Sequence, residues 1–204
     1  MKKILLSAIA LSLSVSVAQA YDHKAKDGFY TQLDAGASRI ETKQDGEKDT
    51  SGHFSPRISI GYKENDLRFA IDYQHFDSTD EENYYTDGFN TTHEKIKSNL
   101  HSFGASLIYD FENESGFTPY VGARISQNKL KLKGTETTNG ITSTNKLSKT
   151  TTGYGAVAGI NYNVTENFAI GLNLEYNYLG KFKFGEEKIR AHQFGVNTGI
   201  RITY

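Results

Sequence analysis

The C-terminal segment 192–204, HQFGVNTGIRITY, alternates strictly between two kinds of side chain and ends the chain on an aromatic residue. Successive side chains of an extended strand point to opposite faces, so one face of this segment is apolar and the other is small or polar. An apolar face toward lipid and a polar face toward a lumen are typical of a transmembrane β-barrel strand. A strand of a soluble hairpin can alternate in the same way, so the rest of the chain must decide.

The same alternation recurs along the whole chain. It is found in the segments 28–38, 54–62, 67–76, 99–111, 118–128, 154–164, 168–178 and 192–204. Long polar connections, 41–52, 77–97, 130–149 and 180–187, alternate with short ones, 63–66, 112–117 and 165–167. The pattern predicts an all-β fold: an eight-stranded antiparallel up-and-down transmembrane β-barrel with four long external loops and three short periplasmic turns.

A soluble barrel of the lipocalin type is the competing interpretation. It would turn its apolar face inward around a core or ligand and its charges outward. The polar face here is rich in Gly, Ser, Asn and ionised residues, which are too small and too polar to fill such a core. Outward aromatics near both strand ends, such as Phe29, Tyr62, Tyr73 and Phe103, suit the two interfaces of a bilayer. The membrane interpretation is therefore favoured.

The N-terminus predicts export. Lys2 and Lys3 precede an apolar, serine-rich run that ends in Ala18-Gln19-Ala20, as in a cleaved signal peptide. We expect residues 1–20 to be a signal peptide and residues 21–204 an outer-membrane barrel domain of a Gram-negative bacterium. The chain has no Cys and a formal net charge of -1. That balance, without a sustained basic run, argues against nucleic acid as a partner.

Several stretches resemble the opacity (Opa) family of Gram-negative outer-membrane proteins. They are GYKENDLRFAIDYQHF from Gly61, FGASLIYDFENESGFTPYVGARISQN from Phe103, AVAGINYNVTENFAIGLNLEYNYLG from Ala156, and the C-terminal strand. The resemblance covers most strands and short turns, and PYVGAR at 119–124 is its most specific part. It implies a small integral barrel of porin type and, for some members, adhesion to host-cell receptors through variable loops. The external loops 77–97 and 130–149 show no match, so the resemblance gives no receptor.

The alternation directs several charged side chains into the lumen. A cluster is expected near mid-membrane, formed by Asp34, Arg57, Asp72, Arg124 and Glu175. A second layer closer to the periplasmic end is expected from Arg68, Asp110 and Arg201. Lone charges in so narrow an interior are costly, so we expect pairing. The cluster is interpreted as a polar plug between opposite walls, with a gated narrow pore as the alternative.

Three outward cations, Lys129, Lys131 and Arg190, are candidates for contacts with lipopolysaccharide phosphates, and ordinary snorkelling is the alternative. His75, His101 and His192 also project outward near the same rim, away from lumenal carboxylates. We therefore expect no catalytic, cofactor-binding or metal-binding residues and no cofactor. The terminal aromatic Tyr204 is expected to serve recognition by the barrel-assembly machinery.

The sequence thus predicts an integral outer-membrane surface protein of the opacity type. Adhesion or host interaction through loops 77–97 and 130–149 is the favoured function, with a host-cell surface receptor as partner beside outer-membrane lipid and lipopolysaccharide. The alternative is a small-solute porin with a narrow gated lumen. An outer-membrane enzyme is the third possibility, because some barrels carry His, Asp and Ser near the outer rim.

Overall fold

The computed structural model describes residues 24–44, 47–86, 91–113, 115–138, 141–184 and 187–204. The expected signal peptide, 1–20, lies outside these residues. The described strands are β1 (Gly28–Gln44), β2 (Glu47–Phe54), β3 (Arg57–Glu64), β4 (Leu67–Thr86), β5 (Thr91–Asp110), β6 (Phe117–Thr138), β7 (Ile141–Asn163), β8 (Phe168–Phe184) and β9 (Glu187–Thr203). Within the described residues, no helix is long and apolar enough to cross a membrane.

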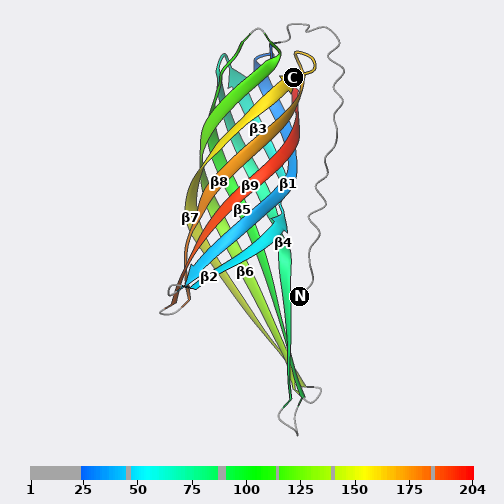
Figure 1. Cartoon of the computed structure of the whole chain (residues 1–204), viewed down its shortest axis with the longest axis vertical. Helices are drawn as coiled ribbons and strands as arrows, with labels where there is room; N and C mark the ends of the chain where they lie inside the picture. Colours follow the sequence, from blue (N-terminus) through cyan, green and yellow to red (C-terminus); the bar gives the residue numbers. More distant parts are fainter. Residues whose placement is uncertain (1–23, 45–46, 87–90, 114, 139–140, 185–186) are drawn as a thin grey trace.

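The strands form one closed antiparallel ring (Figure 1). Neighbours follow chain order from β3 to β9, and β1 pairs with both β3 and β9. The closing ladder runs from Tyr30 opposite Thr203 to Lys43 opposite Arg190. From β3 round to β9 and β1 the ring closes on itself, as a membrane span requires, whereas β2 pairs with β1 alone. The predicted eight-stranded up-and-down barrel is confirmed, because β2 and β3 together form one wall.

The break between β2 and β3 falls at Ser55 and Pro56. Proline has no backbone N–H and cannot donate to a ladder. The wall nevertheless stays attached on both sides: the Ser55 N–H donates to the Gly36 carbonyl at 2.9 Å, and the His75 N–H donates to the Pro56 carbonyl at 3.0 Å. The interruption therefore changes the strand count without opening the ring.

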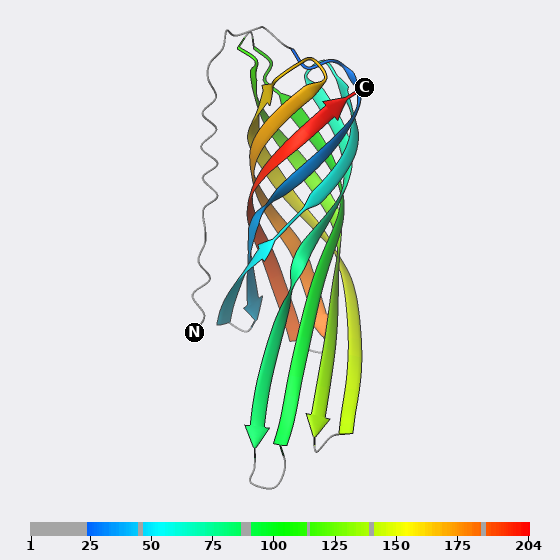
Figure 2. The same cartoon turned by 90° about the vertical axis from the view of Figure 1, so that its right-hand side faces the viewer.

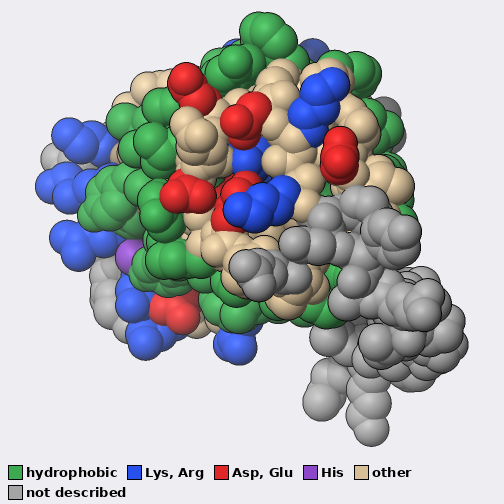
Figure 3. All heavy atoms as spheres, turned by 90° about the horizontal axis from the view of Figure 1, so that it is seen from above, with side chains coloured by type: hydrophobic (Ala, Val, Ile, Leu, Met, Phe, Trp, Pro, Cys, Tyr) green, Lys and Arg blue, Asp and Glu red, His purple; other side chains and the backbone are tan. Residues whose placement is uncertain are grey.

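Side chains alternate between the two faces as the sequence predicts. On β1, Leu33 is 53% exposed, whereas the adjacent Asp34 is 4% exposed. Viewed onto the end that carries the C-terminus, hydrophobic side chains ring the outside and charged ones gather toward the middle (Figure 3). We call this the turn end of the barrel and the opposite one the hairpin end. The exposed apolar band suits a lipid environment.

The long connections differ from the expectation of loops. Residues 77–97 and 130–149 lie almost wholly in strands, because β4 continues to Thr86, β5 starts at Thr91, β6 continues to Thr138 and β7 starts at Ile141. The segments 41–52 and 180–187 are likewise mostly strand. Their Thr, Tyr and Ile content favours extended structure, and each strand is already paired where it leaves the ring. The long connections predicted between the strands are therefore mostly extended hairpins in the described residues.

Four of these extensions join into a single sheet. Thr79 on β4 lies opposite Ser98 on β5, Ser98 opposite Leu132 on β6, and Leu132 opposite Leu147 on β7. We call residues 79–86, 91–98, 132–138 and 141–147 the projecting sheet. Figures 1 and 2 show it reaching well beyond the β1–β2 and β8–β9 hairpins. The two segments expected to act as separate loops thus form one surface.

A small apolar core fills the interior near the hairpin end. We call it the apolar plug; its members are Ile40, Phe76, Leu100, Leu179, Phe182 and Ala191, with Leu130 packed against it. Phe76 and Leu179 are both 0% exposed. Each lies at a β-bulge, between Phe76 and Thr79 on β4 and between Tyr178 and Gly180 on β8. A bulge adds an unpaired residue and re-aims the chain; Gly180, with φ 112°, allows the turn on β8.

Candidate functional surfaces: the charged interior and the projecting sheet

The five charges expected near mid-membrane are all buried in the barrel interior, and the structure brings them together. We call them the hairpin-side layer. Arg57 donates from Nη1 to Glu175 at 2.6 Å, and its Nε lies 3.5 Å from an Asp34 oxygen. Arg124 donates to both oxygens of Asp72, at 3.0 and 2.5 Å. The Arg57–Glu175 and Arg124–Asp72 pairs tie together strands that are not neighbours in the sheet, whereas Asp34 lies directly opposite Arg57 on the neighbouring strand β1.

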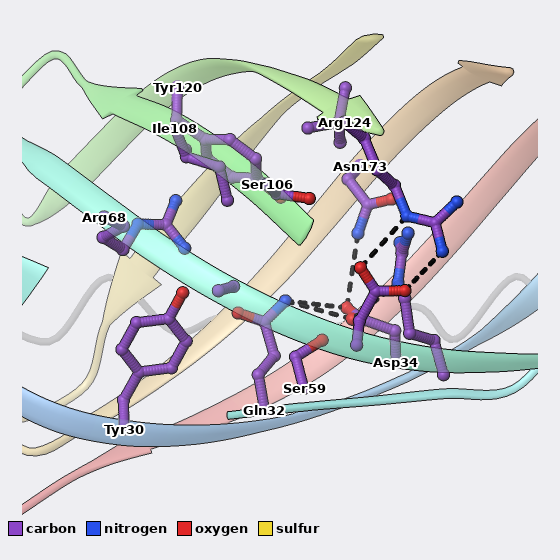
Figure 4. Close-up of a pocket in the computed structure, with 14 residues that line it drawn as sticks. Tyr30, Gln32, Asp34, Ser59, Arg68, Ser106, Ile108, Tyr120, Arg124 and Asn173 are labelled. Carbon is purple, nitrogen blue, oxygen red and sulfur yellow. Dashed lines mark hydrogen bonds and ion pairs between the residues drawn. The ribbon is translucent and has the colours of Figure 1, made fainter. Parts of the chain in front are cut away.

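Neutral polar side chains complete this layer, and the sequence reasoning missed them. Glu175 also accepts from Gln74 at 2.9 Å and from Gln193 at 2.7 Å. Asp34 accepts from Gln32 at 2.9 Å and from Asn173 at 3.3 Å (Figure 4). All four lie at inward positions of the alternation, so the signal was present in the sequence. A buried carboxylate needs such donors to offset its lost hydration.

Glycine provides the space for one of these arginines. A Cβ on Gly104 would lie 2.6 Å from the Arg124 guanidinium. The side chain of Arg124 therefore lies over the bare backbone of β5, where it also donates to Ser102 Oγ at 3.1 Å. This close approach explains why an inward position of a charged layer holds glycine.

The three charges expected closer to the periplasm form a second layer, the turn-side layer. Arg68 makes a two-point contact with Asp110, both bonds being 2.7 Å. The Arg68 guanidinium also lies 4.8 Å from the centre of the Tyr120 ring. Arg201 is buried in the same region, but among the described residues it forms no ion pair with a carboxylate. The structure thus pairs two of the three expected charges.

The turn end is closed by a lysine. Lys63 is 2% exposed, and its Nζ lies 2.7 Å from Glu112 and 3.0 Å from Asp27. It also donates to the Asn65 carbonyl at 2.6 Å. Asp27 lies before β1, and its hydrogen bond from Lys63 lowers the pKa of the Asp27 carboxyl. Together with the apolar plug, this contact leaves the interior filled at both ends.

The projecting sheet carries paired charges on one face. Lys97 lies 2.9 Å from Asp80, and Lys95 contacts Glu82, in each case directly across the β4–β5 ladder. Hydrogen bonds from these lysines lower the pKa of Asp80 and of Glu82. Tyr84 stacks on His93 with ring centres 4.3 Å apart. Cross-strand pairs of this kind fix the strand register.

Towards its tip, the projecting sheet exposes large side chains. Tyr84 is 67% exposed, Tyr85 60% and Ile141 79%. Tyr84 and Tyr85 are adjacent on β4, so their side chains point to opposite faces of the projecting sheet. Thr92 and Thr138 bond across β5 and β6 at 3.0 Å, which holds the two hairpins together near the tip. The sheet thus offers aromatic, polar and charged groups on a paired scaffold.

The rim histidines lie on the outer surface, as expected from the alternation. His75 and His101 face each other across β4 and β5 and stack with ring centres 4.9 Å apart. His192 bonds through Nδ1 to the Tyr176 hydroxyl at 2.9 Å. In the described part of the chain, no group of three or more His, Cys, Asp and Glu side chains could hold a metal ion.

The three candidate lipopolysaccharide contacts are exposed but do not form one group. Lys129 and Lys131 lie on β6, whereas Arg190 lies on β9 between Lys43 and Lys181. β7 and β8 separate the two positions. Lipopolysaccharide contact remains a prediction, now for two separate sites.

Tyr204 lies at the outer surface of the ring and is 65% exposed. Its N–H donates to the Phe29 carbonyl at 2.8 Å, and its hydroxyl lies 3.2 Å from Thr31 Oγ1. The terminal aromatic is therefore held against β1, where the ring closes. Its recognition by the barrel-assembly machinery remains a prediction.

Comparison with known proteins shows which family this chain is similar to. A family model described as "Opacity family porin protein" matches residues 60–204. A Haemophilus influenzae protein is 31% identical over the full length of both chains. The protein Opa of the same organism is 30% identical over 69% of this chain and 97% of its own.

A solved structure is also similar to this chain in fold and in sequence. The crystal structure of Neisserial surface protein A matches with a TM-score of 0.59 and 34% identity, covering 87% of this chain and 97% of that one. The chain therefore belongs to the Opacity family of outer-membrane β-barrel proteins.

Proposed function

We propose that the protein is a surface adhesin whose binding surface is the projecting sheet. One observation carries the proposal: β4 to β7 continue beyond the ring as a single hydrogen-bonded sheet (Figure 2). In outer-membrane barrels the long connections face the outside of the cell. The sheet would hold Tyr84, Tyr85 and Ile141 well away from the bilayer, where a host-cell receptor could reach them.

The filled interior supports the same proposal. A solute would have to pass the apolar plug, both charged layers and the Lys63 contact in series. Four of these side chains are at most 1% exposed: Phe76 and Leu179 in the apolar plug, and Arg68 and Asp110 in the turn-side layer. This arrangement favours a surface function over transport through the lumen. It argues against the small-solute pore that the sequence left as the alternative.

Alanine substitution of Tyr84, Tyr85 and Ile141 tests the proposal. Aromatic anchors often contribute most of the binding energy at an interface, so adhesion of expressing bacteria to epithelial cells should fall at least tenfold. The matched control is Tyr154→Ala, because Tyr154 is 66% exposed but belongs to the membrane-facing band of β7. Unchanged adhesion in the triple variant, with normal surface expression, would reject this tip as the binding surface.

A further inference from the structure

Four cations lie in one row across neighbouring strands at the hairpin end. Lys43 on β1 lies directly opposite both Lys48 on β2 and Arg190 on β9. Arg190 in turn lies directly opposite Lys181 on β8. Residues directly opposite one another on neighbouring strands point to the same face of the sheet. We call these four residues the cation row.

The cation row faces the outside of the ring. Ala191, the residue after Arg190, is buried in the apolar plug. Alternation along β9 therefore places Arg190, and with it the whole row, on the outer face. The side chains of Lys43 and Lys48 are 43% and 63% exposed. The row is thus accessible to a molecule beside the barrel.

The positive charge of this surface is compensated only in part. Glu41 lies 3.1 Å from Lys43 and 4.0 Å from Lys48. Among the described residues, the other two members of the row form no ion pair with a carboxylate. One same-face position further out, Lys183 lies directly opposite Lys188. Like charges directly opposite each other destabilise a sheet, so the arrangement favours an anionic partner.

The height of the cation row indicates which anion it meets. One same-face position nearer the turn end, His192 stacks on Tyr178 with ring centres 5.1 Å apart and bonds to the Tyr176 hydroxyl. Outward aromatic side chains of a barrel mark the membrane interface. Two residues along a strand advance it by about 7 Å. The row therefore lies just beyond the interface, at the level of the lipid phosphates.

We propose that the cation row binds the phosphates of lipopolysaccharide in the outer leaflet. Ammonium and guanidinium groups form charge-assisted hydrogen bonds with phosphate oxygens. The row extends the contact expected for Arg190 alone to four residues on four strands, so that one lipid can meet several cations at once. The site is independent of the proposed adhesion, since β1, β2, β8 and β9 lie outside the projecting sheet.

Binding of lipid A to the purified mature protein in detergent micelles tests the site. Native mass spectrometry counts the lipid A molecules bound to each barrel, with EDTA present so that divalent cations cannot bridge phosphates to carboxylates. Wild type should bind diphosphoryl lipid A roughly tenfold more tightly than lipid A without phosphates, because only the former accepts hydrogen bonds from the row. Equal affinity for the two lipids overturns the proposal.

A double variant and a matched control locate the contact. Lys181→Gln with Arg190→Gln should lose the preference for phosphate, and both side chains face outward, so the barrel should keep its heat-modifiable mobility on gels. Lys133 and Lys146 are also directly opposite each other, but in the projecting sheet. Lys133→Gln with Lys146→Gln removes the same charge farther from the membrane and should keep the preference.

Two further outcomes would also overturn the assignment. An equal loss of phosphate preference in the two double variants would show that net charge alone causes it. Inorganic tripolyphosphate serves as a soluble competitor in the same measurement. Binding of tripolyphosphate to wild type as tight as that of diphosphoryl lipid A would assign the cation row to a soluble polyanion and not to the lipid.

Discussion

Arg57 on β3 and Glu175 on β8 meet inside the barrel, with Arg57 Nη1 2.6 Å from a Glu175 oxygen. β1 and β9 separate these strands in the ring. The ion pair therefore crosses the lumen and joins two strands that share no hydrogen-bonded ladder. With Asp34 on the other side of Arg57, it makes that arginine the centre of the hairpin-side layer.

Replacing Arg57 with Ala should destabilise the barrel strongly. The change leaves Asp34 and Glu175 buried without their cation, and breaking a buried pair in this way costs about 3–5 kcal/mol. Urea-induced unfolding in lipid vesicles would measure the loss. Arg190→Ala is the matched control and should change the free energy of unfolding by under about 1 kcal/mol, because Arg190 is exposed. An equal loss of unfolding free energy in Arg57→Ala and Arg190→Ala would contradict a stabilising role for the Arg57–Glu175 ion pair.

The interior should not conduct. The apolar plug and the charged layers lie in series, so removing one charge does not open a path. In planar bilayers, wild type and Asp72→Ala should therefore both give no steady single-channel current. Phe76→Ala combined with Asp72→Ala should also give no steady current, because the Arg68–Asp110 pair and the Lys63 contact still fill the turn end. A steady current through wild type would show that the interior opens.

The two long hairpins should behave as one sheet. Ile96 on β5 lies directly opposite Gly134 on β6, and the chain has no native Cys. Ile96→Cys with Gly134→Cys should therefore form a disulfide within one chain under mild oxidation, because opposite residues bring their Cβ atoms close together.

Ile96→Cys with Glu136→Cys is the control for that experiment. Glu136 lies opposite Glu94, one same-face position away from Gly134. This pair should cross-link far more slowly. Equal cross-linking of both pairs would indicate two independent hairpins.

Acid should weaken the charge pairing of the projecting sheet. The pKa values of Asp80 and Glu82 are lowered by the lysine hydrogen bonds, so their contribution is full above the unfolded-state pKa and is lost as the pH falls through the folded-state pKa. Carboxyl NMR titration should give low midpoints for both groups. Lys97→Gln should raise the Asp80 midpoint, whereas Lys146→Gln, on β7, should not. Identical Asp80 midpoints in both variants would reject the Lys97 contact as the cause.

The barrel could be predicted because the alternation of apolar and polar residues can be read within each strand separately. Alternation at Leu33 and Asp34 fixes which face of β1 meets lipid, and the same rule repeated on each wall gives the ring and places the interior charges. The choice of partner for each charge could not be predicted, because it depends on how far neighbouring strands are staggered. Arg201, expected among the paired charges by position alone, lies beside Tyr30 instead.

The hairpin end was harder to predict for a different reason. Residues 77–97 and 130–149 are polar, and a polar stretch predicts a loop, although paired strands in water are also polar on both faces. The alternation did contain part of the apolar plug, since Phe76 and Leu100 occupy inward positions at the ends of recognised strands. Leu179 could not be placed, because a β-bulge beside Gly180 shifts its register.

Shortening the projecting sheet tests the adhesion proposal most directly. Residues 79–98 and 132–147 would each be replaced by a tight turn, which keeps the ring, the apolar plug and both charged layers. A second variant would shorten the β1–β2 and β8–β9 hairpins as the matched control. Binding of expressing bacteria to epithelial cells should be lost in the first variant and kept in the second, with both barrels assembled in the outer membrane. Full binding by an assembled barrel that lacks the projecting sheet would contradict the account.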